Sequence, residues 1–186
     1  MKTSREDVVE RSFPLFLKKG FDGATMAELV QASGLSKGAF YYYFEDKASL
    51  YEACVERFFN SFLPDPAASP ASAGAFVRAL AESYAAALRA AAAACGDPSA
   101  FLRFVLSAPE ARRGQFAALV SDGRGRLAGL LGREGFARRE AESEAQRLLA
   151  IVEGAGVLAA VSGDDAPEGR IRDIVEGYLS KLGLRD

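Results

Sequence analysis

The chain has 186 residues, which is long enough to bury a hydrophobic core, so its size excludes a miniprotein held together by disulfides. Hydrophobic residues make up 49% and charged residues 26% of the chain, a balance that fits a folded globular protein and argues against bulk disorder. The formal net charge of -2 excludes a general polycationic attraction to nucleic acid or membranes, so any DNA binding must be local.

The side chains that most enzymes and metal sites require are scarce. The chain contains no His and two Cys, Cys54 and Cys95, which removes imidazole acid–base chemistry, His-based zinc sites and nucleophile–His triads. The sequence also lacks a phosphate-binding glycine loop and carboxylates clustered at metal-ligand spacing. We therefore expect no enzyme activity, no cofactor and no metal site.

The N-terminus gives no sign of export. Residues 1–10 are highly charged and lack the apolar stretch of a signal peptide, and the longest apolar run, residues 90–95, is far too short to cross a bilayer. We expect a cytoplasmic protein without a membrane partner, in which the two Cys are small buried hydrophobic residues.

Apolar residues recur with the helical period along nearly the whole chain, and no stretch alternates convincingly as a β-strand does, so we predict an all-α protein. The first helix follows Ser4, which can cap it, and ends at Gly20. Pro14 lies inside this helix, where a proline removes a backbone hydrogen bond and can cost about 3 kcal/mol. We therefore predict a kink at Pro14.

Two short helices with a tight turn between them come next. Thr25 and Glu28 form a capping box, in which the hydroxyl and the carboxylate can each satisfy a free backbone amide. The helix that starts there can run to about Ser33, and Ser36 can cap a second helix over residues 37–44. This arrangement predicts a helix-turn-helix.

A fourth predicted helix is capped by Asp46 and carries a broad apolar face. The proline-containing stretch 63–72 cannot continue this helix and is the clearest break in the chain, so we place a domain boundary near it. Glycines and prolines divide the remainder into five further helices, which gives about nine in all. These five are predicted at about residues 73–95, 98–107, 109–133, 138–162 and 167–183.

Several residues in the first third of the chain occur together in a specific order. They are Phe16, the run Lys19-Gly20-Phe21, Thr25 and Met26, the block GLSKGAFYYYF at residues 34–44, Asp46-Lys47 and Leu50. On these residues, the stretch from about Ser4 to Phe59 resembles the N-terminal domain of the TetR family of bacterial transcriptional regulators. The rest of the chain resembles the family only in length, helicity and an amphipathic last pair of helices.

The resemblance implies two domains joined by the fourth helix. An N-terminal three-helix domain with the helix-turn-helix, residues 1–46, would bind DNA. A C-terminal helical bundle, residues 47–186, would bind a ligand and form a dimer.

The second helix of a helix-turn-helix enters the major groove with its first turn leading. Gly38 and Ala39 are small enough there to let the backbone approach DNA closely, and Lys37 can bond to a guanine or a phosphate. The resemblance implies phosphate contacts at Thr25, Ser36, Tyr41, Tyr42 and Lys47, with Lys37, Gly38, Ala39 and Tyr43 nearest the bases. Residues 25–47 contain two Lys against three acids, so affinity must also come from dimer avidity, directed hydrogen bonds and the outlying Lys2, Arg5 and Lys18 or Lys19.

The last two predicted helices each carry an apolar face that needs a partner surface. Gly154 and Gly156 would let another helix approach closely. The resemblance implies that these helices pair with their copies into a four-helix bundle, forming a homodimer suited to an inverted repeat in double-stranded DNA. The expected interface residues are Leu148, Ile151, Val152, Ala155, Leu158, Ile171, Ile174, Val175, Tyr178 and Leu182. The alternative is that the same residues form the core of a single chain.

Aromatic residues between the DNA-binding helices and the dimer helices could line an apolar ligand pocket, or they could be ordinary core. They are Phe58, Phe62, Tyr84, Phe101, Phe104 and Phe116. Because few acids accompany them and Arg103 lies nearby, we expect an apolar or anionic small-molecule effector.

Together these features predict a ligand-responsive transcriptional regulator, a repressor that binds an inverted-repeat operator as a homodimer and is released by its effector. The helix over residues 47–62 would transmit the signal, because a ligand that tilts it changes the separation of the two DNA-reading heads. The alternative is a helical module that binds a ligand or a protein without recognising DNA. The acidic pair Glu45-Asp46 and the low isoelectric point support that alternative.

Overall fold

The computed structural model describes residues 3–62, 70–163 and 166–184, with the side chains of residues 59–62, 111–113 and 115–116 outside the description. Within these residues every regular element is a helix, so the all-α prediction is confirmed. The helices of the described part are α1 (Arg5–Gly23), α2 (Met26–Ser33), α3 (Lys37–Tyr43), α4 (Lys47–Phe62), α5 (Ala73–Cys95), α6 (Ala100–Leu106), α7 (Glu110–Arg133), α8 (Arg138–Val161) and α9 (Pro167–Leu182).

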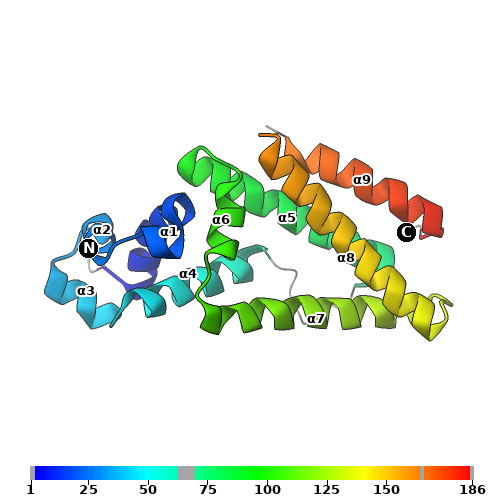
Figure 1. Cartoon of the computed structure of the whole chain (residues 1–186), viewed down its shortest axis with the longest axis horizontal. Coiled ribbons are helices and arrows are strands. Elements are labelled where there is room, and N and C mark those ends of the chain that lie inside the picture. Colours follow the sequence, from blue (N-terminus) through cyan, green and yellow to red (C-terminus); the bar gives the residue numbers. More distant parts are fainter. Residues whose placement is uncertain (1–2, 63–69, 164–165, 185–186) are drawn as a thin grey trace.

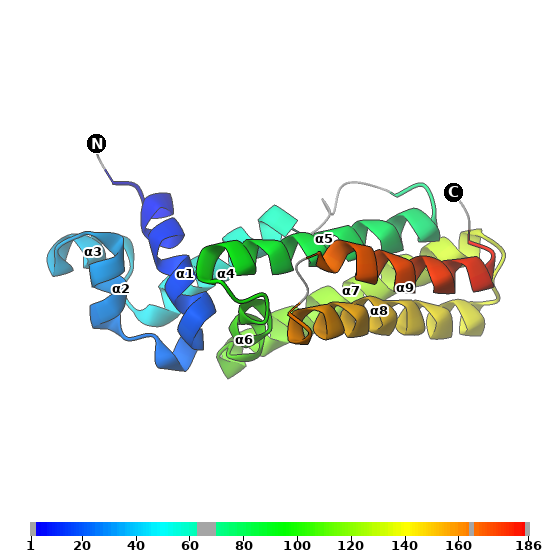
Figure 2. The ribbon, with the colours of Figure 1, turned by 90° about the horizontal axis from the view of Figure 1, so that it is seen from above.

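Figures 1 and 2 show an elongated molecule with two different ends. Helices α1, α2 and α3 form a head at one end, and α5, α7, α8 and α9 pack into a bundle at the other. Helix α4 leads out of the head, and α6 lies between the head and the bundle, where it packs against α1. None of the helices in the described part is long and apolar enough to cross a membrane.

The helices of the head begin where side chains satisfy their first backbone amides. Ser4 caps α1, Thr25 and Glu28 form the predicted capping box at the start of α2, and Ser36 caps α3. Helix α2 ends at Gly34, whose φ of 71° lies in the left-handed region that glycine adopts without strain. The tight turn between α2 and α3 is therefore built from the residues that predicted it.

The predicted kink at Pro14 is wrong in its position. The backbone of α1 keeps helical torsion angles at Pro14, and the interruption lies at Gly20, with φ 71° and ψ -178°. The helix tolerates Pro14 because the buried side chains of Val9 and Phe16 anchor the turns on both sides of it. Gly20 is itself buried, and an added Cβ would lie 3.0 Å from the Ser107 side chain of α6. The interruption therefore occurs where another helix meets α1.

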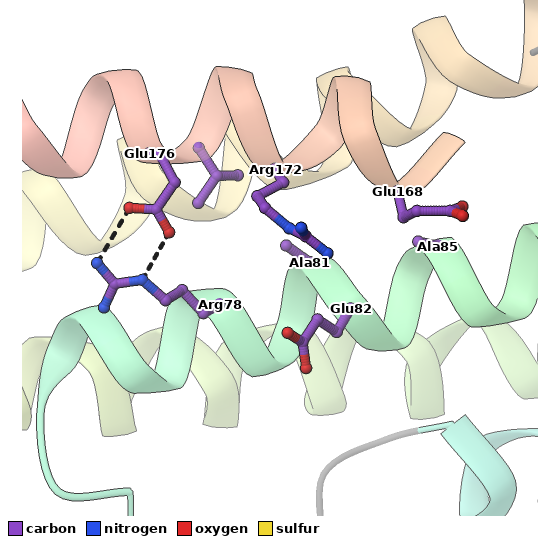
Figure 3. Close-up of a pocket in the computed structure, with 8 residues that line it drawn as sticks. Arg78, Ala81, Glu82, Ala85, Glu168, Arg172 and Glu176 are labelled. Atoms are coloured by element: carbon purple, nitrogen blue, oxygen red, sulfur yellow. Dashed lines mark hydrogen bonds and ion pairs between the residues drawn. The ribbon is translucent and has the colours of Figure 1, made fainter. Parts of the chain in front are cut away.

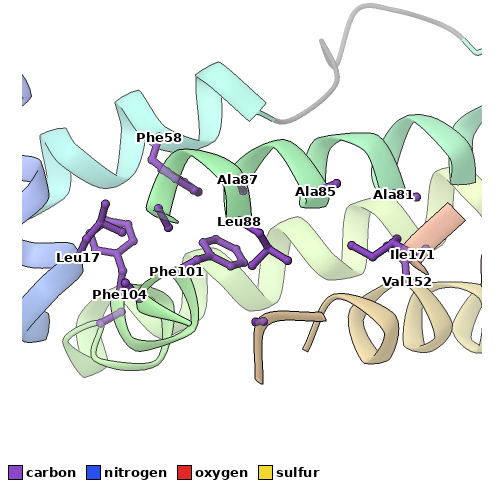
Figure 4. Packing of buried hydrophobic residues seen from close by; sticks show 14 of the residues in the cluster. Leu17, Phe58, Ala81, Ala85, Ala87, Leu88, Phe101, Phe104, Val152 and Ile171 are labelled. Atoms are coloured by element: carbon purple, nitrogen blue, oxygen red, sulfur yellow. The ribbon is translucent and has the colours of Figure 1, made fainter. Parts of the chain in front are cut away.

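A series of aromatic rings links α4, α5 and α6. Phe58 stacks on Phe101 with ring centroids 5.4 Å apart, and Phe101 meets the ring of Tyr84 edge-on at 5.3 Å. Phe104 lies 5.8 Å from Phe58 and 5.0 Å from Tyr51, measured between ring centroids. Figure 4 shows Phe58, Phe101 and Phe104 gathered where these helices meet. This aromatic cluster forms a shared core between the head side and the bundle side of the molecule.

Candidate nucleic-acid interface

The outer surface of α3 is open. Lys37 and Gly38 are exposed, and a Cβ added at Gly38 would meet no atom within 4 Å outside its own stretch of helix. Tyr42 is 84% exposed and Tyr41 is 42% exposed, whereas Ala39 is half-buried. We call Lys37, Gly38, Tyr41 and Tyr42 the α3 surface. Its shape lets the start of α3 approach another molecule closely.

The hydroxyls of Thr25 and Ser36, both expected at phosphates, act as helix caps. Thr25 Oγ1 donates to Glu28 Oε2 at 2.9 Å and accepts from the Glu28 backbone amide at 3.3 Å. A hydrogen bond from Lys19, followed by those from Thr25, lowers the pKa of Glu28 from 4.5 to about 2. Ser36 Oγ accepts from the backbone amide of Ala39 at 3.3 Å. A phosphate at Thr25 would therefore compete with Glu28 for the hydroxyl proton, whereas Ser36 uses its hydroxyl only as an acceptor among the described residues.

The tyrosines of α3 lie in different environments. Tyr43, expected nearest the bases, is half-buried, and its hydroxyl donates to the backbone oxygen of Thr3 at 2.5 Å. The guanidinium of Arg5, the first residue of α1, lies 4.6 Å from the ring centre of Phe44, so a second contact holds the start of α1 against the end of α3. Tyr42 meets the Tyr43 ring edge-on at 5.1 Å and is far more exposed. Of these rings, Tyr42 is the one most accessible to DNA.

Lys47, also expected at a phosphate, is bound within the protein. Its Nζ donates to the backbone oxygens of Phe21 and Ala24, at 2.8 and 3.1 Å, and lies 4.3 Å from the ring centre of Phe21. These oxygens belong to the C-terminal end of α1, where a cation satisfies free carbonyls and the helix dipole. Two of the three ammonium donors are used in this way, which leaves one for a phosphate.

The residues expected to line a ligand pocket pack against one another where the structure describes them. Phe58, Phe101 and Phe104 are buried, and the ring contacts given above join them to the half-buried Tyr84. The other expected residues, Phe62 and Phe116, have side chains outside the described ones.

An acid that the sequence analysis did not include accompanies the aromatic cluster. Partial desolvation of its carboxyl raises the pKa of Glu153 in α8, a residue that is otherwise exposed, and a hydrogen bond with Tyr84 partly offsets this rise. Burial, and then the charge of Glu153, raises the pKa of the Tyr84 phenol. Arg103, whose charge favoured an anionic effector, donates instead to backbone oxygens of α1. The one specific observation that favoured an anion is therefore accounted for by another contact.

The residues expected at a dimer interface divide between two faces of α8 and α9. Those buried in the core of the single chain are Leu148, Val152, Ala155, Ile171 and Val175. Those that are half-buried are Ile151, Tyr178 and Leu182. Leu158 and Ile174 are exposed, by 58% and 39%, and so are Val157 and Val161, by 39% and 72%, which were not in the expected set. The face available to a second copy therefore has a different composition from the one expected.

A charged groove of about 200 Å³ lies between α5 and α9 (Figure 3). Arg78 and Glu176 form a two-bond pair there, with Nε–Oε1 and Nη2–Oε2 distances of 2.6 and 3.0 Å. Arg172, Glu82 and Glu168 also line the groove, which therefore holds two arginines and three glutamates. The Arg78–Glu176 pair ties α5 to α9, and the sequence analysis missed it because its members are 98 positions apart.

The thiols and acids of the described part offer no metal centre. Cys54 is buried, which raises the pKa of its thiol, and Cys95 is half-buried. Both are free cysteines. No group of three or more His, Cys, Asp or Glu side chains that could hold a metal ion occurs among the described residues.

The helices that build the head match a known family. Residues 8–54 fit the model described as bacterial regulatory proteins, tetR family. The head of the chain, and not its full length, is thus similar to this family. The matched residues cover α2, α3 and most of α1, together with the first half of α4.

Two curated relatives are similar to this chain over a stretch of fewer than 60 residues. The regulator IcaR of Staphylococcus epidermidis, named as the HTH-type negative transcriptional regulator of the biofilm operon icaADBC, is 29% identical over 59 residues, which are 32% of this chain and 32% of IcaR. YerO of Bacillus subtilis, named as an uncharacterized HTH-type transcriptional regulator, is 44% identical over 55 residues, which are 29% of this chain and 19% of YerO. The similar stretch therefore spans less than a third of these relatives.

Solved structures extend the similarity in fold to nearly the whole chain. A transcriptional regulator from Aquifex aeolicus VF5 superposes with a TM-score of 0.69 at 20% identity, over 96% of this chain and 98% of that one. A TetR transcriptional regulator from Chloroflexus aurantiacus J-10-FL gives a TM-score of 0.67 at 22% identity, over 95% and 93%. The expected fold, a helix-turn-helix domain followed by a helical bundle, is confirmed.

Proposed function

We propose that this chain is a DNA-binding transcriptional regulator that acts as a repressor. The observation that carries the proposal is the open α3 surface on a head similar to that of the TetR family. In a helix-turn-helix the start of this helix meets base edges in the major groove, where Lys37 can bond to guanine and the missing side chain of Gly38 permits close approach. The negative regulation named for IcaR favours repression.

The protein acts as a homodimer on an inverted repeat. The exposed apolar side chains of Leu158, Val161 and Ile174 on α8 and α9 support this part of the proposal, because such a group in a protein surface marks a place where another surface binds. A two-fold dimer presents two equivalent heads, and two tethered heads bind two half-sites far more tightly than one head binds one.

An effector that binds the bundle releases the DNA. The aromatic cluster supports this part, because Tyr84 of α5 is joined through Phe101 of α6 to Phe58 of α4, the helix that leads out of the head. A ligand that displaces these rings would shift α4 relative to the head. It can lower DNA affinity only by as much as its affinities for the two arrangements differ.

Selection of bound sequences from a random duplex pool, with the full chain at one stated salt concentration, tests the proposal. We expect enrichment of an inverted repeat, and we expect Tyr42→Ala to bind the enriched duplex more weakly while it unfolds at the wild-type temperature, because this ring is 84% exposed. The matched control is Arg138→Ala, a similarly exposed side chain at the start of α8.

Enrichment of a single half-site would refute the dimeric mode. If a folded wild type enriches no sequence, with or without cell extract, the chain is instead a ligand-binding or protein-binding module.

A further inference from the structure

The C-terminal end of α1 is held by side chains of α6. Arg103 Nη1 donates to the backbone oxygens of Leu17 and Lys18, at 3.2 and 3.1 Å. Ser107 Oγ accepts from the backbone amide of Phe21 at 2.9 Å. We call this set of hydrogen bonds the α1–α6 latch. Its bonds fall on both sides of the interruption in α1.

The latch replaces hydrogen bonds that α1 loses at its interruption. Because Gly20 is not helical, the carbonyls of the turn before it and the amide after it lack their usual partners within the helix. Arg103 and Ser107 supply those partners from a different part of the chain. The fit is close, since a Cβ at Gly20 would lie 3.0 Å from both Cβ and Oγ of Ser107.

Arg103 is in turn fixed by the connection between α5 and α6. Its Nη2 pairs with Asp97 Oδ2 at 3.0 Å, and Asp97 Oδ1 accepts from the amide and the hydroxyl of Ser99 at 2.8 and 2.6 Å. Asp97 directly follows Gly96, which ends α5. A displacement at the end of α5 therefore reaches the backbone of α1 through Asp97 and Arg103.

The head is attached to the rest of the protein through the continuous helix α4, whose Lys47 binds the same end of α1, and through the packing of α1 on α5 and α6. The latch is the hydrogen-bonded part of the contact between α1 and α6, where the rings of Phe13 and Phe104 also meet edge-on. A tilt of α4 alone cannot reorient the head unless the latch moves with it or opens. This constraint changes the mechanism expected from the sequence, in which α4 acted by itself.

We propose that Arg103 and Ser107 are positioning residues for DNA recognition. They fix the orientation of the head relative to the bundle, and in a dimer they thereby fix the spacing of the two heads. The inference rests on the proposed function and names the contact through which that function is regulated. Closed latches hold the heads at the operator spacing, and open latches leave the heads free to adopt other spacings.

The test compares the wild type with the double variant Arg103→Met, Ser107→Ala in the full chain. Mobility shifts on duplexes whose half-sites are separated by successive single base pairs measure the ratio of affinity at the best spacing to affinity at its neighbours. We expect the ratio to fall about ten-fold in the double variant, and the amides of residues 17–24 to exchange about ten-fold faster, because several hydrogen bonds are lost together. The double variant Arg103→Lys, Ser107→Ala keeps a donor at position 103, so its spacing ratio should lie between those of the wild type and of Arg103→Met, Ser107→Ala.

The matched control is Arg89→Met. Arg89 pairs with Glu168 at 2.9 Å on the bundle and is exposed to a similar degree as Arg103, so its loss should leave both measurements unchanged. If the double variant unfolds, Ser107→Ala alone is measured in its place; it leaves Arg103 intact and removes the bond to the Phe21 amide, together with the bond that Ser107 Oγ donates to the Phe104 backbone oxygen within α6 at 3.2 Å.

An unchanged spacing ratio overturns the inference, even if amide exchange is faster, because the latch would then stabilise the joint without setting the heads. A wild type that binds no duplex refutes the proposed function instead, and exchange of residues 17–24 still reports on the latch.

Discussion

Replacing Gly156 with Ala tests the packing of α8 on α5, which holds one end of the aromatic cluster. A Cβ at this position would lie 2.1 Å from Cε1 and 2.4 Å from Cδ1 of Tyr84, so the ring has to move. Movement also disturbs the edge-on contact of Tyr84 with Phe101. Overpacking of this kind costs about 1–3 kcal/mol, against about 1 kcal/mol that Ala gains over Gly inside a helix. We expect a net loss of about 1 kcal/mol in the free energy of unfolding.

Urea unfolding at one fixed protein concentration measures this loss, since association would shift the apparent stability. The control is Gly129→Ala in α7, an exposed position with no atom within 4 Å of the added Cβ, where we expect a gain of about 0.5–1 kcal/mol. In a Tyr84→Ala background, Gly156→Ala should also become stabilising. If Gly156→Ala is as stable as Gly129→Ala, the reasoning is refuted. A penalty that persists without the Tyr84 ring would refute it equally.

Three further predictions concern the head and the dimer. Lys47→Met removes two hydrogen bonds to the end of α1 and should lower the free energy of unfolding by about 1–2 kcal/mol. Lys37→Met should instead leave Tm unchanged and weaken operator binding. If calorimetry gives the two variants the same Tm, these roles are contradicted. The pKa of Glu28 is lowered from 4.5 to about 2, so the contacts of its carboxylate stabilise the fold above pH 4.5 and are lost as the pH falls toward 2. In the variant Glu28→Gln, Tm should therefore decline less steeply than in the wild type between pH 4.5 and 2, and equally above pH 4.5. A decline as steep as that of the wild type between pH 4.5 and 2 would contradict this role of Glu28. Leu158→Glu combined with Ile174→Glu should give a folded monomer in sedimentation, and a variant that still dimerises would place the interface elsewhere.

The bounds of the helices were predictable because the capping and helix-breaking residues that set them act within a few positions along the chain. The pairing of Thr25 with Glu28 starts α2, and the first turn of α9 begins at Pro167, as the sequence indicated. The sequence also indicated Gly20, where α1 is interrupted, as the end of the first helix, but Ser107 lies 86 positions from the Phe21 amide that it binds and could not be found from local signals. Propensity alone pointed to Pro14 for the kink, whereas tertiary packing keeps that turn helical.

The candidate site was predictable in part, for a similar reason. The motif pointed to Lys37, Gly38, Tyr41 and Tyr42, which are exposed on α3, but also to Ala39 and Tyr43, which are half-buried. Helical spacing could not separate the two apolar faces of α8, so Leu148 and Val152 of the core were grouped with the exposed Leu158. Likewise, the sequence pointed to Lys47 as a charged residue at the start of α4, but only the folded structure shows that it binds the backbone oxygens of Phe21 and Ala24.

Several cations of the head are engaged within the protein, and this determines how the chain can bind DNA. Arg11 donates to a backbone oxygen at the end of α2 at 2.8 Å, Lys19 pairs with Glu28, and Lys47 binds α1. Lys37 stays exposed on the α3 surface. A head of this kind gains little from general attraction to phosphates, so one head alone should bind weakly and with a shallow dependence on salt. Most of the affinity must then come from the second head of a dimer, whose contribution depends on geometry. A contact that sets head spacing, such as the latch of Arg103 and Ser107, therefore controls binding more strongly here than it would in a protein with a basic head.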